Sequence, residues 1–107
     1  MNNTDEVKYE PFYSANFKKT YKKAKKQGLN IDALKWGIEQ LAKDLPLPVS
    51  WYDHKLTNFK PKSGRKGNFR ECHIDGSGNW LLVYEKQEGI MLLYLYGIGS
   101  HADLLNL

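Results

Sequence analysis

The sequence predicts an α+β fold with the element order β-α-α-β-β-β, in which a mainly antiparallel sheet carries a hairpin of helices on one face. Two stretches with helical spacing of apolar residues follow each other in the first half of the chain. Three strand-like stretches, separated by turn sequences, occupy most of the second half. With 107 residues, the chain is long enough for one domain with a modest core, so we expect a single domain over residues 1–107.

The first elements expected are a short strand at residues 7–12 and the helix that follows it. Pro11 cannot donate a backbone hydrogen bond, which places the strand at a sheet edge or marks its end. Ser14 is suited to cap the start of the helix, and Gly28 is suited to follow its end. The apolar positions of this helix repeat at i, i+4 and i+7 and are Phe17, Tyr21 and Ala24, with lysines on the other sides.

A second helix is expected directly after the first. Asn30 is a favourable N-cap residue, and the Leu-Pro-Leu-Pro sequence at residues 45–48 ends the helical pattern. One apolar stripe runs along this helix and consists of Ile31, Leu34, Ile38 and Leu41. The link between the two helices is short, so they should form an αα-hairpin.

The stretch from residue 44 to residue 67 shows no periodic pattern and is expected to be a long loop. It is too aromatic to be simply disordered. We expect four of its side chains to tie it to the core, namely Trp51, Tyr52, His54 and Phe59. Its basic segment at residues 60–66 is expected to face solvent.

Three strands in a meander should complete the fold, at residues 68–74, 80–86 and 90–96. The links at 75–79 and 87–89 have the composition of hairpin turns. Gly97 and Gly99 are expected to end the sheet, and Ser100 to start a last short turn. The helical hairpin would then cover one face of the sheet and leave the opposite face free for function.

The first of these strands carries an unusual run of ionisable residues. Side chains alternate along a strand, so Glu71 and His73 share one face while Arg70 and Cys72 share the other. Glu71 and His73 are then roughly 6–7 Å apart. A carboxylate at that distance favours the protonated imidazole, which suits proton transfer near neutral pH. Cys72 is the only cysteine, which excludes an internal disulfide, and is interpreted as a small buried residue.

The basic residues are concentrated in two blocks. Residues 11–31 hold six lysines, and residues 54–70 hold four lysines and two arginines, with no acidic residue in either block. The rest of the chain has four basic and twelve acidic residues, a balance of 4 − 12 = −8. Such segregation indicates a polyanionic partner, most often a nucleic acid. A solvated lysine face on a surface helix is the alternative interpretation.

Other compositional features point to a soluble protein of the cytoplasm. No apolar run approaches the ~20 residues needed to span a bilayer, so no membrane contact is expected. The first ten residues are polar and acidic and do not resemble a signal peptide. A single cysteine fits a reducing compartment.

Five motifs carry a resemblance to a known family. They are Leu-Pro-Leu-Pro at 45–48, Asp-His-x-Leu at 53–56, Phe-Arg-Glu-Cys-His at 69–73, Trp-Leu-Leu-Val-Tyr at 80–84 and Gly-Ser-His-Ala-Asp-Leu at 99–104. In these motifs and in their order, the chain resembles the YafQ branch of the RelE/ParE toxin superfamily. These proteins are the toxin halves of bacterial type II toxin–antitoxin pairs, and their fold is the β-α-α-β-β-β arrangement expected above.

The resemblance implies a small endoribonuclease that needs no metal or other cofactor and cuts messenger RNA on the ribosome, in contact with ribosomal RNA. A cognate antitoxin would neutralise it, and operator DNA would be contacted only through the toxin–antitoxin complex. The expected reaction is attack of a ribose 2′-OH on the adjacent phosphate. That reaction requires a base, an acid and support for the charged intermediate.

The resemblance also implies which residues form the site. The catalytic candidates are His54, His73, His101 and Glu71, and which histidine is the acid and which the base is left open. The substrate-binding candidates are Trp80, Asn79, Arg70, Tyr96, Lys60, Lys62, Arg65 and Lys66. A zinc site is the other interpretation of three histidines with Cys72. We expect no metal, because positions 54, 72, 73 and 101 show no finger-like pairing and Cys72 and His73 point to opposite faces.

Three positions depart from the family pattern. Asn79 stands where the family has an aspartate, Gly97 where it has an arginine, and Leu105 where many members have an aromatic residue. A missing arginine would weaken stabilisation of the phosphate unless another cation replaces it. These departures favour an alternative function. In it the chain is a non-catalytic toxin or remnant that binds a protein target, as the ParE branch binds DNA gyrase, or only its antitoxin.

Overall fold

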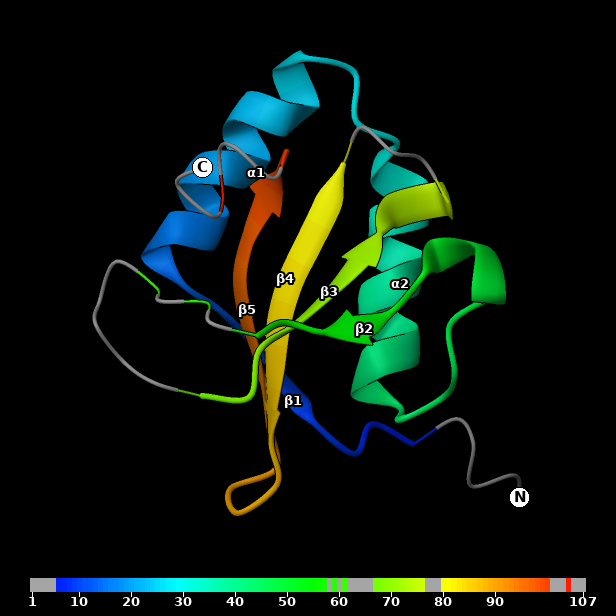
Figure 1. Ribbon diagram of the computed structural model, residues 1–107, viewed down its shortest axis with the longest axis vertical. Coiled ribbons are helices and arrows are strands. Elements are labelled where there is room, and N and C mark those ends of the chain that lie inside the picture. Colours follow the sequence, from blue (N-terminus) through cyan, green and yellow to red (C-terminus); the bar gives the residue numbers. More distant parts are fainter. Residues whose placement is uncertain are drawn as a thin grey trace.

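A five-stranded sheet with the strand order β1-β5-β4-β3-β2 forms the centre of the molecule. The structure is a computed structural model, and it describes residues 6–57, 59, 61, 67–76, 80–100 and 104. The strands are β1 (Glu10–Tyr13), β2 (His54–Lys55), β3 (Arg70–His73), β4 (Leu81–Gln87) and β5 (Leu92–Gly99). The helices are α1 (Ala15–Lys26) and α2 (Ile31–Ala42), with short 3₁₀ turns η2 (Val49–Trp51) and η3 (Ile74–Gly76) (Figure 1). The predicted α+β fold is therefore confirmed.

Both helices begin and end where the capping residues predict. The Ser14 hydroxyl accepts a hydrogen bond from the Phe17 amide at 2.9 Å, and the Asn30 side chain accepts one from the Ala33 amide at 3.1 Å. Gly28 follows α1 with a φ of 95°, a left-handed conformation that glycine adopts without strain. Local sequence signals are enough to place this helical hairpin.

The two outer strands differ most from expectation. β1 begins at Glu10 instead of residue 7, and it pairs in parallel with β5, whereas the other neighbouring pairs are antiparallel. The sequence does not predict β2, because its two residues, His54 and Lys55, are too few to show a periodic pattern. β2 pairs with β3 and so draws the middle of the long 44–67 stretch onto the sheet edge.

The predicted end of the sheet at Gly97 is wrong, because β5 continues to Gly99. Gly97 is a close-packing position: a Cβ atom there would lie 2.6 Å from Asn16 Nδ2 and 2.9 Å from Leu104 Cδ2. The glycine lets α1 approach β5, and the Asn16 side chain then donates a hydrogen bond to the Tyr96 carbonyl at 3.0 Å. A larger residue at position 97 has no space in this arrangement.

Gly97→Ala should therefore destabilise the protein by about 1–3 kcal/mol, the usual cost of overpacking. The matched control is Gly89→Ala in an exposed turn, where nothing lies within 4 Å of the added Cβ atom. That change should stay within about 1 kcal/mol of wild type. Urea unfolding of the two variants measures the difference, and equal midpoints would contradict the close-packing role of Gly97.

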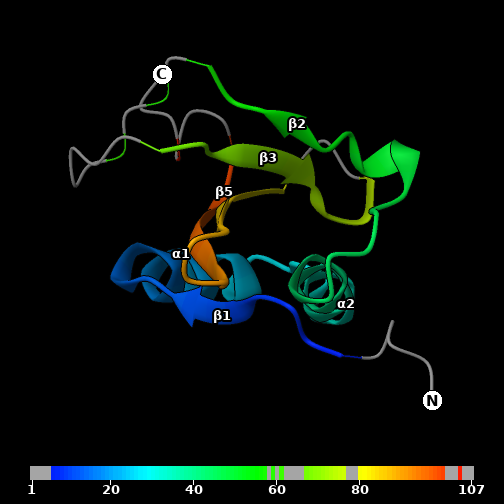
Figure 2. The ribbon, with the colours of Figure 1, turned by 90° about the horizontal axis from the view of Figure 1, so that it is seen from below.

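Hydrophobic clusters lie on both faces of the sheet. The first fills the space between the sheet and the two helices, which lie on the same side of it (Figure 2). The second lies on the opposite face and consists of Phe69, Leu81, Val83, Tyr96 and Leu104, with Leu56, Phe59 and Tyr94 packed against it. The expectation that this face is free is therefore wrong in part, because an apolar cluster covers its middle. In the part of the chain that the structure describes, no helix has the length and apolar character to cross a membrane.

Candidate active site

The pairing of β2 with β3 places His54 beside Glu71. The Nε2 atom of His54 lies 3.5 Å from Oε1 of Glu71, whose side chain is 0% exposed. On the other side of the ring, Nδ1 lies 2.7 Å from the carbonyl oxygen of Tyr52. A carbonyl oxygen only accepts hydrogen bonds, so Nδ1 is the donor in this contact. The contact with the Tyr52 carbonyl thus orients the imidazole of His54 so that Nε2 faces the buried carboxylate of Glu71.

The ring of Tyr52 lies next to both described histidines. Its centroid is 4.5 Å from that of His54 and 5.8 Å from that of His73, and the two histidine rings are 6.5 Å apart. Tyr52 is 65% exposed and has a φ of 47°, which is unusual for a bulky residue. Such backbone strain persists only where the surrounding structure fixes it, and it is common at functional sites. The prediction that Tyr52 anchors the loop in the core is wrong; it belongs to the histidine cluster.

Trp51 is the residue that anchors this loop, as the sequence predicts. Its side chain is 5% exposed and packs against α2, where its ring would lie 2.6 Å from a Cβ atom added at Gly37. The ring of Trp36 meets it edge-on at a centroid distance of 5.5 Å. Because Tyr52 and His54 follow Trp51 directly, this packing sets the position of the histidine cluster.

The alternation predicted for β3 is confirmed. We call the sheet face under the helices the inner face and the opposite one the outer face. Phe69 lies in the cluster on the outer face, and Cys72 lies in the cluster on the inner face. Glu71 shares the outer face with His73, but the ion pair that the structure describes joins Glu71 to His54. The sequence could not reveal this pair, because it depends on the register of a two-residue strand.

Arg70 is held on the face opposite Glu71. Its guanidinium donates to the carboxylate of Asp53 from Nε and Nη2, each at 3.3 Å. Tyr84 donates its hydroxyl to the same carboxylate at 2.5 Å. Burial and this hydrogen bond raise the pKa of the Tyr84 phenol well above its usual range, so it remains a donor. Burial works against the charged form of Arg70, but the hydrogen bond with Asp53 prevails and raises its pKa. These contacts tie the loop residue next to His54 to β3 and β4.

Cys72 lies on the same inner face and is fully buried. Burial raises the pKa of its thiol far above the usual value, so the reactive thiolate is scarce. We predict that the single thiol of the native protein does not react with an aromatic disulfide reagent at pH 8, and that it reacts fully in denaturant. A native thiol that reacts as fast as the denatured one would contradict this burial.

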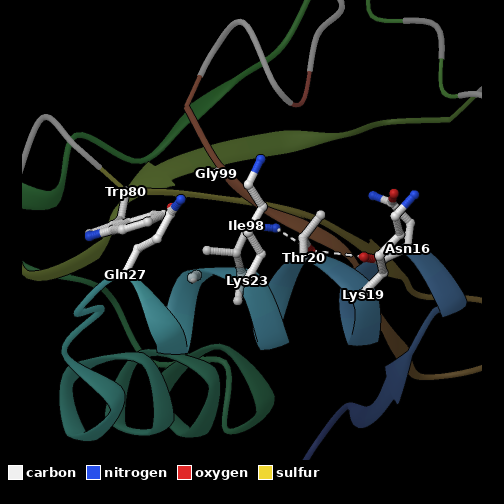
Figure 3. Close-up of a pocket in the computed structure, with 9 residues that line it drawn as sticks. Asn16, Lys19, Thr20, Lys23, Gln27, Trp80, Ile98 and Gly99 are labelled. Atoms are coloured by element: carbon white, nitrogen blue, oxygen red, sulfur yellow. Dashed lines mark hydrogen bonds between the residues drawn. The ribbon is translucent and has the colours of Figure 1, made fainter.

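Two further candidates lie apart from the histidine cluster. Tyr96 is buried in the outer cluster, with its ring 5.2 Å from that of Phe59 and 5.9 Å from that of Phe69. Trp80 packs against the inner cluster, on the helix side of the sheet, where it lines a cavity beside α1 (Figure 3). The structure thus brings together Tyr52, His54, Glu71 and His73, and it places the side chain of Trp80 on the other face.

The remaining candidates lie outside the described residues. They are His101, Asn79, Lys60, Lys62, Arg65 and Lys66. Within the described ranges, no group of three or more histidine, cysteine or acidic side chains is arranged to hold a metal ion.

The order of elements and the small mixed sheet are those of a bacterial toxin of the type II toxin–antitoxin systems. A family model described as bacterial toxin of type II toxin–antitoxin system, YafQ, matches residues 9–106. The chain therefore belongs to the YafQ toxin family, which confirms the resemblance drawn from its motifs.

Solved structures agree with this assignment. The chain is 32% identical to the toxin in a crystal structure of the Escherichia coli DinJ–YafQ complex, with 90% of this chain and 97% of that chain covered and a TM-score of 0.71. It is 31% identical to a metal-bound toxin from Helicobacter pylori, with coverages of 92% and 99% and a TM-score of 0.74. YafQ from E. coli strain BL21(DE3) is 30% identical, with coverages of 89% and 96% and a TM-score of 0.70. Among curated proteins, no match was found.

Proposed function

We propose that this toxin is an endoribonuclease that cleaves messenger RNA by attack of a ribose 2′-OH on the adjacent phosphate, without a metal ion. The observation that carries the proposal is the cluster of Tyr52, His54, Glu71 and His73 at the edge of the sheet. Two imidazoles lie with their ring centroids 6.5 Å apart, and one of them is beside a buried carboxylate. Together they would supply groups for proton transfer and for hydrogen bonds to the phosphate at one place.

The two described histidines have different surroundings, which suggests different roles. His54 is oriented by the Tyr52 carbonyl and lies beside Glu71, so its ring is fixed in position and suits contact with the phosphorane. His73 is half-buried and forms no ion pair within the described residues, so its ring nitrogens are available to move a proton. We assign to His101 the second proton-transfer role, on the strength of the family motif that contains it.

Partners follow from the same proposal. The solved toxin–antitoxin complex of the E. coli relative with DinJ supports a cognate antitoxin as the partner of this chain. Operator DNA would be contacted only through that complex. The two basic blocks would hold phosphates of messenger and ribosomal RNA in the cytoplasm, with binding that weakens as salt rises.

Primer extension on a reporter messenger RNA after brief induction tests the nuclease proposal. Wild type is compared with His73→Ala and His101→Ala, and the assay is repeated with purified ribosomes in EDTA. Discrete cuts that survive EDTA and disappear in both variants are the expected result. Cuts that persist in both variants, or that need a divalent metal, would contradict the proposed mechanism.

The close packing at Gly97 favours a second candidate function. Asn16 and Leu104 fill the space that a side chain at position 97 would need. The arginine of the family pattern therefore does not fit at this position. A toxin that lacks this cation would act by binding a protein target or only its antitoxin. Growth arrest without RNA cleavage in the same induction experiment would support this candidate.

A further inference from the structure

A cavity of about 240 Å³ lies between α1 and the adjoining ends of β4 and β5, on the helix side of the sheet. Trp80 and Gln27 stand at one end of it, Asn16 and Lys19 stand at the other, and Lys23 lies between them (Figure 3). Because Glu71 and His73 lie on the opposite face of the sheet, this cavity is distinct from the histidine cluster.

The charge of the cavity is entirely positive. Lys19 and Lys23 are its only charged lining residues, and within the described residues neither forms an ion pair. The two are i and i+4 on α1, and like charges at that spacing repel each other. An anion between them would relieve this repulsion.

The walls of the cavity are held in place before any ligand binds. Asn16 donates to the Tyr96 carbonyl at 3.0 Å, and the Thr20 hydroxyl accepts from the Ile98 amide at 3.0 Å. These bonds fix α1 against β5, and they occupy the Asn16 amide nitrogen and the Thr20 hydroxyl. The side-chain amide of Gln27 has no hydrogen bond within the described residues and remains available to a ligand beside the indole of Trp80.

We propose that this cavity binds one nucleotide of single-stranded RNA, an inference that rests on the nuclease function proposed above. The ammonium groups of Lys19 and Lys23 would hold the phosphate, the indole of Trp80 would lie against the base, and Gln27 would contact the base edge. An acidic peptide would satisfy the lysines, but it would make no use of a flat ring with an amide beside it. The mixture of charge, ring and amide therefore favours a nucleotide.

The position of the cavity relative to the histidines fits this assignment. The amide of Ile74, directly after His73, donates to the carbonyl of Trp80 at 2.9 Å. The end of β3 and the start of β4 are therefore adjacent, with the histidine cluster on one face and the cavity on the other. An RNA strand that crosses this end of the sheet would engage both, so the cavity would position the strand for cleavage.

Binding of a 2′-O-methylated RNA hexamer, measured by fluorescence anisotropy, tests the proposal without cleavage of the probe. The variant Lys19→Ala/Lys23→Ala is compared with Lys22→Ala/Lys26→Ala, which has the same charge change and the same spacing on the same helix. The cavity pair should raise Kd roughly tenfold or more, and the slope of log Kd against log salt should fall by about 0.7 for each phosphate that the protein no longer neutralises. Lys22 and Lys26 do not line the cavity but belong to the same basic block, so the control variant should lose only diffuse charge and raise Kd clearly less than the cavity variant does.

Trp80→Leu forms the second arm, because it keeps an apolar side chain against the core but removes the flat ring. Loss of stacking on one base should raise Kd about 5-fold or more, with the thermal unfolding midpoint recorded alongside. An oligoglutamate peptide serves as the competing probe. If the cavity pair loses affinity for this peptide as strongly as for RNA, and Trp80→Leu binds RNA normally, the nucleotide assignment is overturned.

The remaining outcomes separate this inference from the nuclease proposal. Equal losses in the cavity and control pairs would mean that α1 binds RNA by diffuse charge, and the cavity assignment would be wrong. If wild type cleaves RNA and the Lys19→Ala/Lys23→Ala variant binds and cleaves RNA as wild type does, only the cavity proposal would be overturned. A wild-type protein that neither binds nor cleaves RNA would overturn both proposals.

Discussion

Replacing His73 with alanine should lower the rate of RNA cleavage by about 10²–10⁴-fold, the usual contribution of a positioned acid or base. The ring of His73 is half-buried beside Tyr52 and His54, so its removal leaves both hydrophobic clusters intact. The thermal unfolding midpoint should therefore stay close to that of wild type. Single-turnover cleavage on programmed ribosomes measures the rate of the chemical step.

The comparison with His101→Ala makes this experiment sharper. If His73 and His101 act as one acid–base pair, the double variant should be little slower than either single variant, because residues that act as a unit give non-additive losses. Losses that multiply would mean that the two histidines act independently. Wild-type cleavage by His73→Ala would rule out a proton-transfer role for this residue.

Trp51→Ala should reduce stability by about 3–5 kcal/mol, as expected for truncation of a buried tryptophan. Trp51 fills the space that Gly37 leaves on α2, and it carries the segment with Tyr52 and His54. Its loss should also free that segment from α2 and slow RNA cleavage. Urea unfolding gives the first effect, and the cleavage rate under strongly folding conditions gives the second.

Trp36→Ala is the matched control, since it makes the same change in the other ring of the same pair. Trp36 is 42% exposed, so its truncation should cost clearly less stability than that of Trp51. It should also slow cleavage far less than Trp51→Ala does, because the loop would keep Trp51 in the space that Gly37 leaves on α2. Equal effects of the two variants would mean that Trp36 and Trp51 anchor the loop together and that Trp51 does not do so alone.

The helical hairpin could be predicted from the sequence because each of its signals is local. Ser14 and Asn30 cap the helices, and the apolar stripes face the sheet as their spacing requires. The course of β5 could not be predicted in this way. Gly97 looks like a residue that ends a strand, but it is small because α1 packs against it, and that contact joins residues about 80 positions apart.

The site shows the same division between local and distant information. Strand alternation alone places Glu71 and His73 on one face. The contact between Glu71 and His54 required the two-residue strand β2, and the role of Tyr52 required its left-handed backbone. No pattern in the sequence encodes either feature, because both arise from how the loop meets the sheet. The packing of the Trp80 indole beside α1 likewise depends on contacts between distant parts of the chain.

The parallel pairing of β1 with β5 has a consequence for when the protein can fold. Glu10 is aligned with Leu92, a separation of 92 − 10 = 82 residues. Contacts between such distant segments form slowly, because a long stretch of chain must first be ordered. During translation the N-terminal strand has no partner until nearly the whole domain has been synthesised. The nascent chain should therefore become protease-resistant only after β5 has left the ribosome, and a chain arrested before β5 should remain unfolded.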